Sequence, residues 1–188
     1  MLIWIILAVL VVAAVYGIAA FNRLVRLRNL SREAWSGIDV QLKRRTDLVP
    51  NLVATVKAYA AHERTVFDEV TAMRASSIAA NDVPGQATAE RGLQASLGKL
   101  LAVAEAYPEL KADKNFLALQ QQLADIEDQL QMARRYYNGT VRNLNISIQS
   151  FPNNLFAAAL GFREAPFFEL DDRGEAAAPG VTFRAAQS

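Results

Sequence analysis

The amino-acid sequence predicts an all-α protein, in which a single N-terminal transmembrane helix continues into an antiparallel four-helix bundle. Residues 2–21 form an uncharged and mostly apolar run. After this run, apolar residues recur at spacings of three and four, which is typical of one face of a helix, and no strand-like alternation occurs. Because short connections separate four such segments, an antiparallel bundle is the arrangement that we expect.

Composition limits the classes of protein and of site. The 188 residues leave room for one domain beyond the apolar run. The net charge of +1 argues against a nucleic-acid partner, because domains that bind nucleic acid usually carry a strong basic excess. The chain has no cysteine, which excludes disulfides, thiolate metal sites and thiol nucleophiles.

Residues 1–22 are predicted to be a transmembrane anchor. Twenty uncharged residues span about 30 Å as a helix, which matches the hydrocarbon core of a bilayer. A cleavable signal peptide is the alternative, because Gly17 and Ala19 have the spacing of a cleavage site, but no basic residue precedes the run and the run is long. Four arginines follow at once, so the positive-inside rule puts the N-terminus outside and the bundle in the cytoplasm.

The first two bundle helices are predicted at about residues 23–45 and 48–80, within a bundle domain of residues 23–152. Thr46 or Asp47 can cap the second helix, and Pro50 then falls in its first turn, where its missing N–H costs nothing. The predicted lengths of the first and last helices do not match well. A helix over 23–45 reaches about 36 Å beyond the bilayer, whereas the last helix would be about 55 Å long.

The third and fourth helices are predicted at about residues 86–106 and 114–150. The third carries Leu93, Leu97 and Leu100 on one face and ends before Pro108. An apolar segment over 153–169 follows, and the bundle topology makes it membrane-proximal. It either contacts the lipid headgroups or plugs the bundle, through Phe156, Phe162, Phe167 and Phe168. Residues 170–188 lack a periodic pattern, so we expect a disordered tail.

No residue pattern indicates catalysis, a cofactor or a metal. The only histidine, His62, is followed by Glu63, which gives neither the Glu-x-x-His pairs of a di-iron bundle nor the two histidines of a helical zinc motif. No serine lies in a G-x-S-x-G elbow, and no glycine-rich phosphate loop is present. We therefore expect a protein that is not an enzyme.

A corner at the end farthest from the membrane is the first candidate for binding a partner. The first predicted helix ends in a basic run, Lys43, Arg44 and Arg45. These cations either interact favourably with the helix dipole or bind an acidic patch on a partner. The predicted turn beside it would face the loop before the last helix. The candidate partner-binding residues of this corner are Arg44, Arg45, Asp47, Asn51, Tyr107 and Glu109.

A polar lock inside the bundle is the second candidate. Glu63 falls on the apolar face of the predicted second helix, and an unpaired buried carboxylate is costly. Arg134 on the last helix is one candidate partner, with Lys57 and Arg64 as local ones. We expect such a pair to fix how the helices are aligned.

The sequence also resembles the LemA family of bacterial membrane proteins. The resemblance rests on blocks that occur in order between about residues 22 and 169, among them EAWSGIDVQLKRR (33–45), DLVPNLV (47–53), TVKAYAAHE (55–63), YPEL (107–110), NFLALQ (115–120) and ARRYYN (133–138). It implies an N-terminal membrane anchor in the bacterial inner membrane, a helical bundle and no known enzymatic activity.

Together these observations predict a membrane-tethered scaffold or interaction protein that forms homo-oligomers and organises membrane proteins. The alternative, which the resemblance suggests, is an adaptor or regulator of a membrane-bound protease in envelope quality control. The predicted partners are the lipid bilayer, a second copy of the chain and other membrane proteins.

Overall fold

The computed structural model describes residues 1–169, so the predicted disordered tail lies outside the described residues. This part of the chain is helical and contains no strand. Its elements are α1 (Leu2–Tyr59), α2 (Arg64–Ala79), α3 (Val83–Glu105), α4 (Pro108–Lys111), α5 (Lys114–Gln149) and the short 3-10 helix η1 (Asn153–Leu155).

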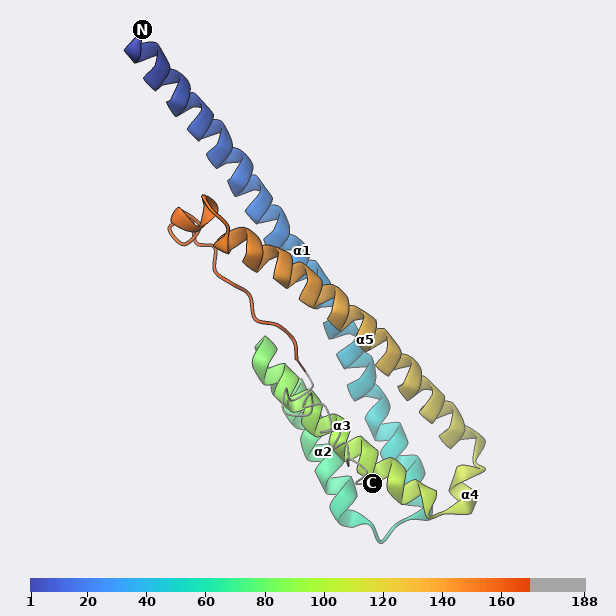
Figure 1. Cartoon of the computed structure of the whole chain (residues 1–188). Coiled ribbons are helices and arrows are strands. Elements are labelled where there is room, and N and C mark those ends of the chain that lie inside the picture. The colour runs from blue at the N-terminus through green and yellow to red at the C-terminus, as the bar shows by residue number, and fades with distance from the viewer. Residues whose placement is uncertain (170–188) are drawn as a thin grey trace, which may run out of the picture.

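The helices pack as two pairs. Figure 1 shows α5 lying along α1, and the α2–α3 pair beside the half of α1 that lies away from the N-terminus. The apolar core follows this arrangement in three clusters. Along α1 they include Leu24, Ile38 and Leu52, and the α5 residues in the same three clusters include Leu144, Tyr137 and Phe116, in that order. Residue numbers therefore increase along α1 in the direction in which they decrease along α5, so the two helices run in opposite directions.

The first part of α1, up to about residue 15, is exposed along its whole length. An 18-residue window in this helix has a mean hydropathy of 2.8 and none of it is buried, so the helix is long and apolar enough to cross a membrane. Large apolar side chains such as Trp4, Val9 and Ile18 are more than 60 % exposed. In water this surface would be unfavourable, because apolar area gains free energy by leaving water.

α1 does not end at residue 45, so the predicted break at Thr46 and Asp47 is wrong. The helix runs through Pro50 to Tyr59. A proline inside a helix leaves the carbonyl four residues earlier without its usual N–H donor. Here that carbonyl belongs to Thr46, and Nε of Arg74 on α2 donates to it at 2.7 Å. A side chain from the neighbouring helix therefore supplies the hydrogen bond that Pro50 cannot.

The first turn lies instead at residues 60–63, so the predicted helix 48–80 is divided between the end of α1 and α2. The backbone N–H of Ala60 bonds to Val56, and that of Glu63 bonds to Ala60. Glu63 occupies the N-cap position of α2. The sequence of this turn, Ala-Ala-His-Glu, contains no glycine, proline, asparagine or serine, which is why turn chemistry did not indicate it.

The later helices begin at side-chain caps. Asp82 precedes α3 and accepts a hydrogen bond from the N–H of Gly85 at 2.7 Å. Asp113 precedes α5 and accepts from the N–H of Phe116 at 2.9 Å. Such caps satisfy donors that the first helical turn leaves unpaired. Their ranges, 83–105 and 114–149, lie within three residues of the predicted ones.

Candidate functional site

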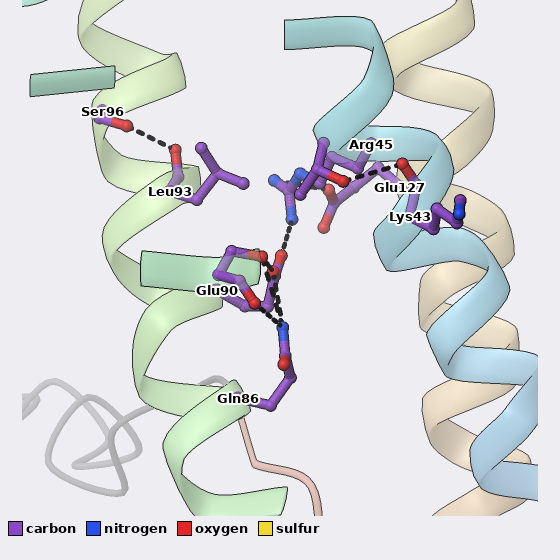
Figure 2. Close-up of polar contacts among 9 residues, drawn as sticks. Lys43, Arg45, Gln86, Glu90, Leu93, Ser96 and Glu127 are labelled. Atoms are coloured by element: carbon purple, nitrogen blue, oxygen red, sulfur yellow. Dashed lines mark hydrogen bonds and ion pairs between the residues drawn. The ribbon is translucent and has the colours of Figure 1, made fainter. Parts of the chain in front are cut away.

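A buried arginine connects three helices. Arg45 on α1 is only 2 % exposed. Its Nη1 lies 3.3 Å from Oε2 of Glu90 on α3, and its Nη2 lies 3.1 Å from Oε2 of Glu127 on α5. Figure 2 shows the side chain of Arg45 reaching from α1 toward Glu90. The planar guanidinium has five N–H donors, which suits it to hold two carboxylates at once.

The fourth helix joins through the second oxygen of Glu90, whose side chain is fully buried. Oε1 of Glu90 accepts hydrogen bonds from the hydroxyl of Ser77 on α2 and from Nε2 of Gln86 at 3.2 Å. Gln86 also donates to the backbone carbonyl of Ser77 at 3.2 Å. We call these five residues the polar cluster: Arg45, Ser77, Gln86, Glu90 and Glu127.

The polar cluster is suited to fixing the alignment of the helices. Each carboxylate oxygen of Glu90 has a partner, as a buried charge requires. Sliding α1 or α3 would separate the buried charges of Arg45 and Glu90, and sliding α2 would remove the Ser77 hydroxyl from Glu90. Within residues 1–169 no group of three or more His, Cys, Asp or Glu side chains could hold a metal ion, and His62 is exposed in the turn after α1.

The predicted lock between Glu63 and Arg134 does not form. Glu63 was expected on the apolar face of a helix, but α1 ends before it and leaves it at the N-cap of α2. This turn follows Val56, which packs in the same cluster as Phe116 near the start of α5. Arg134 lies 18 residues further along α5, which is about 27 Å away along the helix. The structure therefore has a polar lock, but with other residues.

The predicted partner-binding corner is split between two regions. Because α1 continues, Arg44, Asp47 and Asn51 are exposed along the helix and not at its end, whereas Arg45 is buried in the polar cluster and unavailable to a partner. Tyr107 and Glu109 lie in the connection before α5; Tyr107 packs partly against the cluster that contains Phe116, and Glu109 is exposed. The structure brings neither to Arg44.

The region around Asp47 faces the connection between α2 and α3. A cavity of about 270 Å³ lies there, lined by α1 residues that include Lys43 and Asp47 and by Ser77, Ile78 and Gln86 from the other side.

At the end of α1 that lies away from the N-terminus, the hydroxyl of Tyr59 donates to Oδ2 of Asp113 at 3.3 Å. The carboxylate of Asp113 raises the pKa of Tyr59 above its ordinary value, because it disfavours the phenolate.

An extended segment, which we call the strap (residues 163–169), is bound to α5 by two asparagines. The side chain of Asn145 accepts from the N–H of Ala165 at 2.9 Å and donates to its carbonyl at 3.0 Å. Asn138 does the same for Phe168, at 2.9 Å and 3.1 Å. Between them, the hydroxyl of Tyr137 donates to the carbonyl of Pro166 at 2.9 Å. Each side-chain amide thus pairs with a backbone as a neighbouring strand would.

The spacing of these contacts matches helix geometry to extended geometry. Asn138 and Asn145 are seven residues apart, so they lie on one face of α5 and about 10.5 Å apart along its axis. Ala165 and Phe168 are three residues apart, which is about 10 Å in an extended chain. Strap and helix therefore stay in register over both contacts. Sequence periodicity could not have revealed this pairing, although the two asparagines at i and i+7 are its visible trace.

The four predicted membrane-proximal phenylalanines fall into two groups. Phe168 is fully buried beside Trp35, with ring centroids 5.4 Å apart, and Phe162 is 2 % exposed, with its ring 5.6 Å from that of Phe21. These two rings fill the core. Tyr137 is buried in the same cluster as Phe168, and this burial raises the pKa of its hydroxyl. Phe156 is half-buried and Phe167 is exposed.

Comparison with known proteins identifies a family. The family model described as the LemA family matches residues 34–183 of this chain, which is more than half of its length. The match begins within α1 and covers the polar cluster, the asparagines of α5 and the strap.

Named relatives come from three bacteria. Two magnetosome proteins of Paramagnetospirillum magneticum, MamQ 1 and MamQ 2, are each 25 % identical over 181 residues, and MamQ of Magnetospirillum gryphiswaldense is 23 % identical. These alignments cover 82 % of this chain and 66 % of each relative, so the chain spans just under two thirds of their length. Protein LemA of Metamycoplasma hominis is 27 % identical over 153 residues, covering 80 % of this chain and 69 % of that protein.

Proposed function

Because this chain belongs to the LemA family, we propose that it is a non-enzymatic scaffold, tethered to the bacterial inner membrane, that self-associates and organises membrane proteins. The anchor is the apolar run of α1, and the body is an antiparallel four-helix bundle made of the remainder of α1 with α2, α3 and α5. The magnetosome relatives support a role at a membrane compartment, since their name refers to such a compartment.

The observation that carries self-association is an apolar stripe on the outward face of α5. Met132, Tyr136 and Ile146 are 48 %, 55 % and 54 % exposed, although each is large and apolar or aromatic. At 100° per residue the three lie within about 80° of one another around the helix. Exposed apolar side chains gathered on one face are typical of interaction surfaces.

A membrane tether makes pairing through this stripe favourable. Every copy stands at the same height and in the same orientation, so the stripes of two copies meet at equal levels. Confinement to a surface also raises the effective concentration of one copy around another. A symmetric pair with Tyr136 near its own counterpart is the arrangement that we expect.

Disulfide cross-linking tests the proposal, because the chain has no cysteine of its own. Tyr136→Cys in native membranes should give a covalent dimer on mild oxidation. Ile78→Cys is the matched control, since Ile78 is 58 % exposed but lies on α2. A chain that stays monomeric with both variants, and under lysine cross-linking, would contradict self-association.

The same membranes distinguish an adaptor from a scaffold. A protease adaptor would copurify with a membrane protease through the exposed charges near Arg44 and Asp47, and Arg44→Glu would release that protease. The scaffold predicts that Arg44→Glu leaves the Tyr136→Cys dimer intact. Loss of a bound protease with no dimer at any stage would favour the adaptor.

A further inference from the structure

The segment after α5 carries apolar side chains that the core does not use. Residues 151–162, which we call the collar, have the sequence FPNNLFAAALGF and contain no charge. Phe151, Leu155 and Leu160 are 79 %, 72 % and 46 % exposed. The collar also points side chains inward, because Ala157 and Phe162 are buried against Leu24 and Leu144. One side of the collar therefore closes the core, and the other presents an apolar surface.

Direct contacts hold the collar against the apolar run of α1. The hydroxyl of Tyr16 donates to Oδ1 of Asn153 at 3.2 Å, and Nδ2 of Asn153 donates to the carbonyl of Ser147 at 2.9 Å. The ring of Phe162 packs edge-on against Phe21. Figure 1 shows the collar beside α1, beyond the end of α5 and toward the N-terminus. Its height along α1 is thus fixed.

That height lies inside the apolar run. The run ends at Phe21, and the first charge after it is Arg23. Tyr16 lies five residues before Phe21, which is about 7.5 Å along the helix axis. Elements that lie in a membrane interface bury their apolar face about 5–10 Å into the boundary between headgroups and acyl chains. If the run spans a bilayer, the collar reaches this depth without any movement.

A groove between the collar and α1 fits the same environment. Its volume is about 1020 Å³, and its lining is almost wholly apolar. Val12, Gly17 and Phe21 line it on α1, and Pro152, Phe156 and Leu160 line it on the collar. Water would gain few hydrogen bonds in such a groove, whereas an acyl chain can fill it.

We propose that the collar is a second membrane contact, which lies in the headgroup boundary of the leaflet nearest the body and takes lipid acyl chains into the groove beside α1. This inference rests on the membrane tether proposed above. The occupant is lipid because the groove continues the exposed apolar surface of α1 and lies at the level of that surface. A plug role is already filled by the buried side chains of Ala157, Phe162 and Phe168.

The test places an environment-sensitive fluorophore at single cysteines in the full chain, reconstituted in vesicles of phosphatidylcholine and phosphatidylglycerol. Leu155→Cys reports on the collar, Val9→Cys on the apolar run and Ile78→Cys on the body. The three side chains are 72 %, 62 % and 58 % exposed, so the protein itself shields them to a similar extent.

Nitroxide groups near the headgroups, or deep in the acyl chains, then measure depth. The label at Leu155 should emit at shorter wavelength than that at Ile78 and be quenched more by shallow nitroxides than by deep ones. Val9 lies 12 residues from Phe21, about 18 Å, so its label should be quenched more by deep nitroxides. Ile78 should report water and be quenched by neither.

The outcomes separate the two proposals. A label at Leu155 that reports water while Val9 reports lipid would overturn the collar contact and leave the tether standing. If both labels report water, the tether fails as well. A label at Leu155 that is shielded but not quenched by either nitroxide, with Leu155→Cys forming a disulfide dimer, would show that a second copy occupies the site and would also overturn the inference.

Discussion

Arg45 forms ion pairs with carboxylates from two other helices. Breaking such a pair lowers the free energy of unfolding by more than the intact pair adds to it. A buried ion pair is often no more stabilising than apolar residues of the same volume. Removing one member, however, leaves an unpaired charge away from water. The value of Arg45 therefore lies in rejecting other alignments of the helices, more than in adding to stability.

Arg45→Met should lower the free energy of unfolding by about 3–5 kcal/mol, because Glu90 stays buried without its cation. Urea unfolding of the full chain in detergent, followed by helical circular dichroism, measures this loss. Arg44→Met is the matched control, since Arg44 is the exposed neighbour and its replacement should change the free energy by about 0.5 kcal/mol or less.

Replacing both partners gives a second check. Arg45→Met combined with Glu90→Leu removes the cation and the buried carboxylate together, so part of the lost stability should return. A double variant that loses the sum of the two single losses would contradict the account of the polar cluster.

α1 remains one helix because α2 completes it. A proline in a helix interior costs about 3 kcal/mol, part of it for the carbonyl that loses its donor. Arg74 of α2 donates to that carbonyl, which belongs to Thr46. The contact joins residues 28 positions apart in the chain. The continuity of α1 is therefore supported by a tertiary contact in addition to its own sequence pattern.

A double-mutant cycle tests this contact. Arg74→Met should cost about 1–3 kcal/mol of unfolding free energy, because the carbonyl of Thr46 is then left without a donor. Pro50→Ala restores an N–H at the right position, so Arg74→Met should cost clearly less in that background. Equal costs in the two backgrounds would show that Arg74 does not act through this carbonyl.

The strap makes a prediction at single backbone positions. Asn138→Ala removes the acceptor of the Phe168 N–H, and Asn145→Ala removes that of Ala165. Hydrogen exchange measured by NMR should therefore accelerate at Phe168 in the first variant and at Ala165 in the second, since each amide loses its protection.

Two further variants sharpen this test. Asn143→Ala, an exposed neighbour on the same helix, should change neither rate. Asn138→Asp keeps an acceptor for the Phe168 N–H, although it replaces the amide donor by a charged carboxylate oxygen, so Phe168 should stay more protected than in Asn138→Ala. Uniform acceleration in all the variants would indicate general loosening of the fold in place of two separate contacts.

Helix periodicity predicted the all-helical fold and the apolar N-terminal helix, but the interpretation of one proline misplaced the first turn. Ile38, Leu42, Arg45, Val49, Leu52 and Val56 follow spacings of four and three without interruption. This pattern indicated both a continuous helix and a buried Arg45. Pro50 is equally compatible with a helix start, and only the contact with Arg74 decides between the two.

The candidate sites were harder to predict for a related reason. Gln86 and Glu90 continue the spacing of Leu93 and Leu97, so their burial had a visible signal. Which charge they would meet depends on how four helices align, and no local pattern contains that. The strap pairs an extended segment with a helix, and its partners are far apart in sequence and share no period.

At the scale of the whole molecule, the continuation of α1 to Tyr59 explains how its length matches that of α5. From residue 22 to Tyr59, α1 extends about 57 Å, and the 36 residues of α5 extend about 54 Å. The mismatch between 36 Å and 55 Å arose from the misplaced turn. The described chain therefore has two matched long helices, with the apolar run extending beyond them at one end.

Orientation can be tested on intact cells with single cysteines. Ile78→Cys is exposed on the body, and we expect an impermeant maleimide to label it only after the cells are permeabilised, because the arginines after the apolar run favour the cytoplasmic side. Leu2→Cys, at the other end of the apolar run, should be labelled without permeabilisation. The reverse pattern would place the body outside.

The unbroken α1 also has a mechanical consequence. No loop separates the apolar run from the far end of the body, so a change of tilt in the bilayer is carried along the whole rod. Transmembrane helices tilt by about 20° on average, and the tilt varies with bilayer thickness. Over about 57 Å, a 20° tilt moves the far end sideways by about 20 Å. A change in local membrane thickness would therefore change the tilt of α1 and, with it, the position of Tyr59 and the turn beyond it.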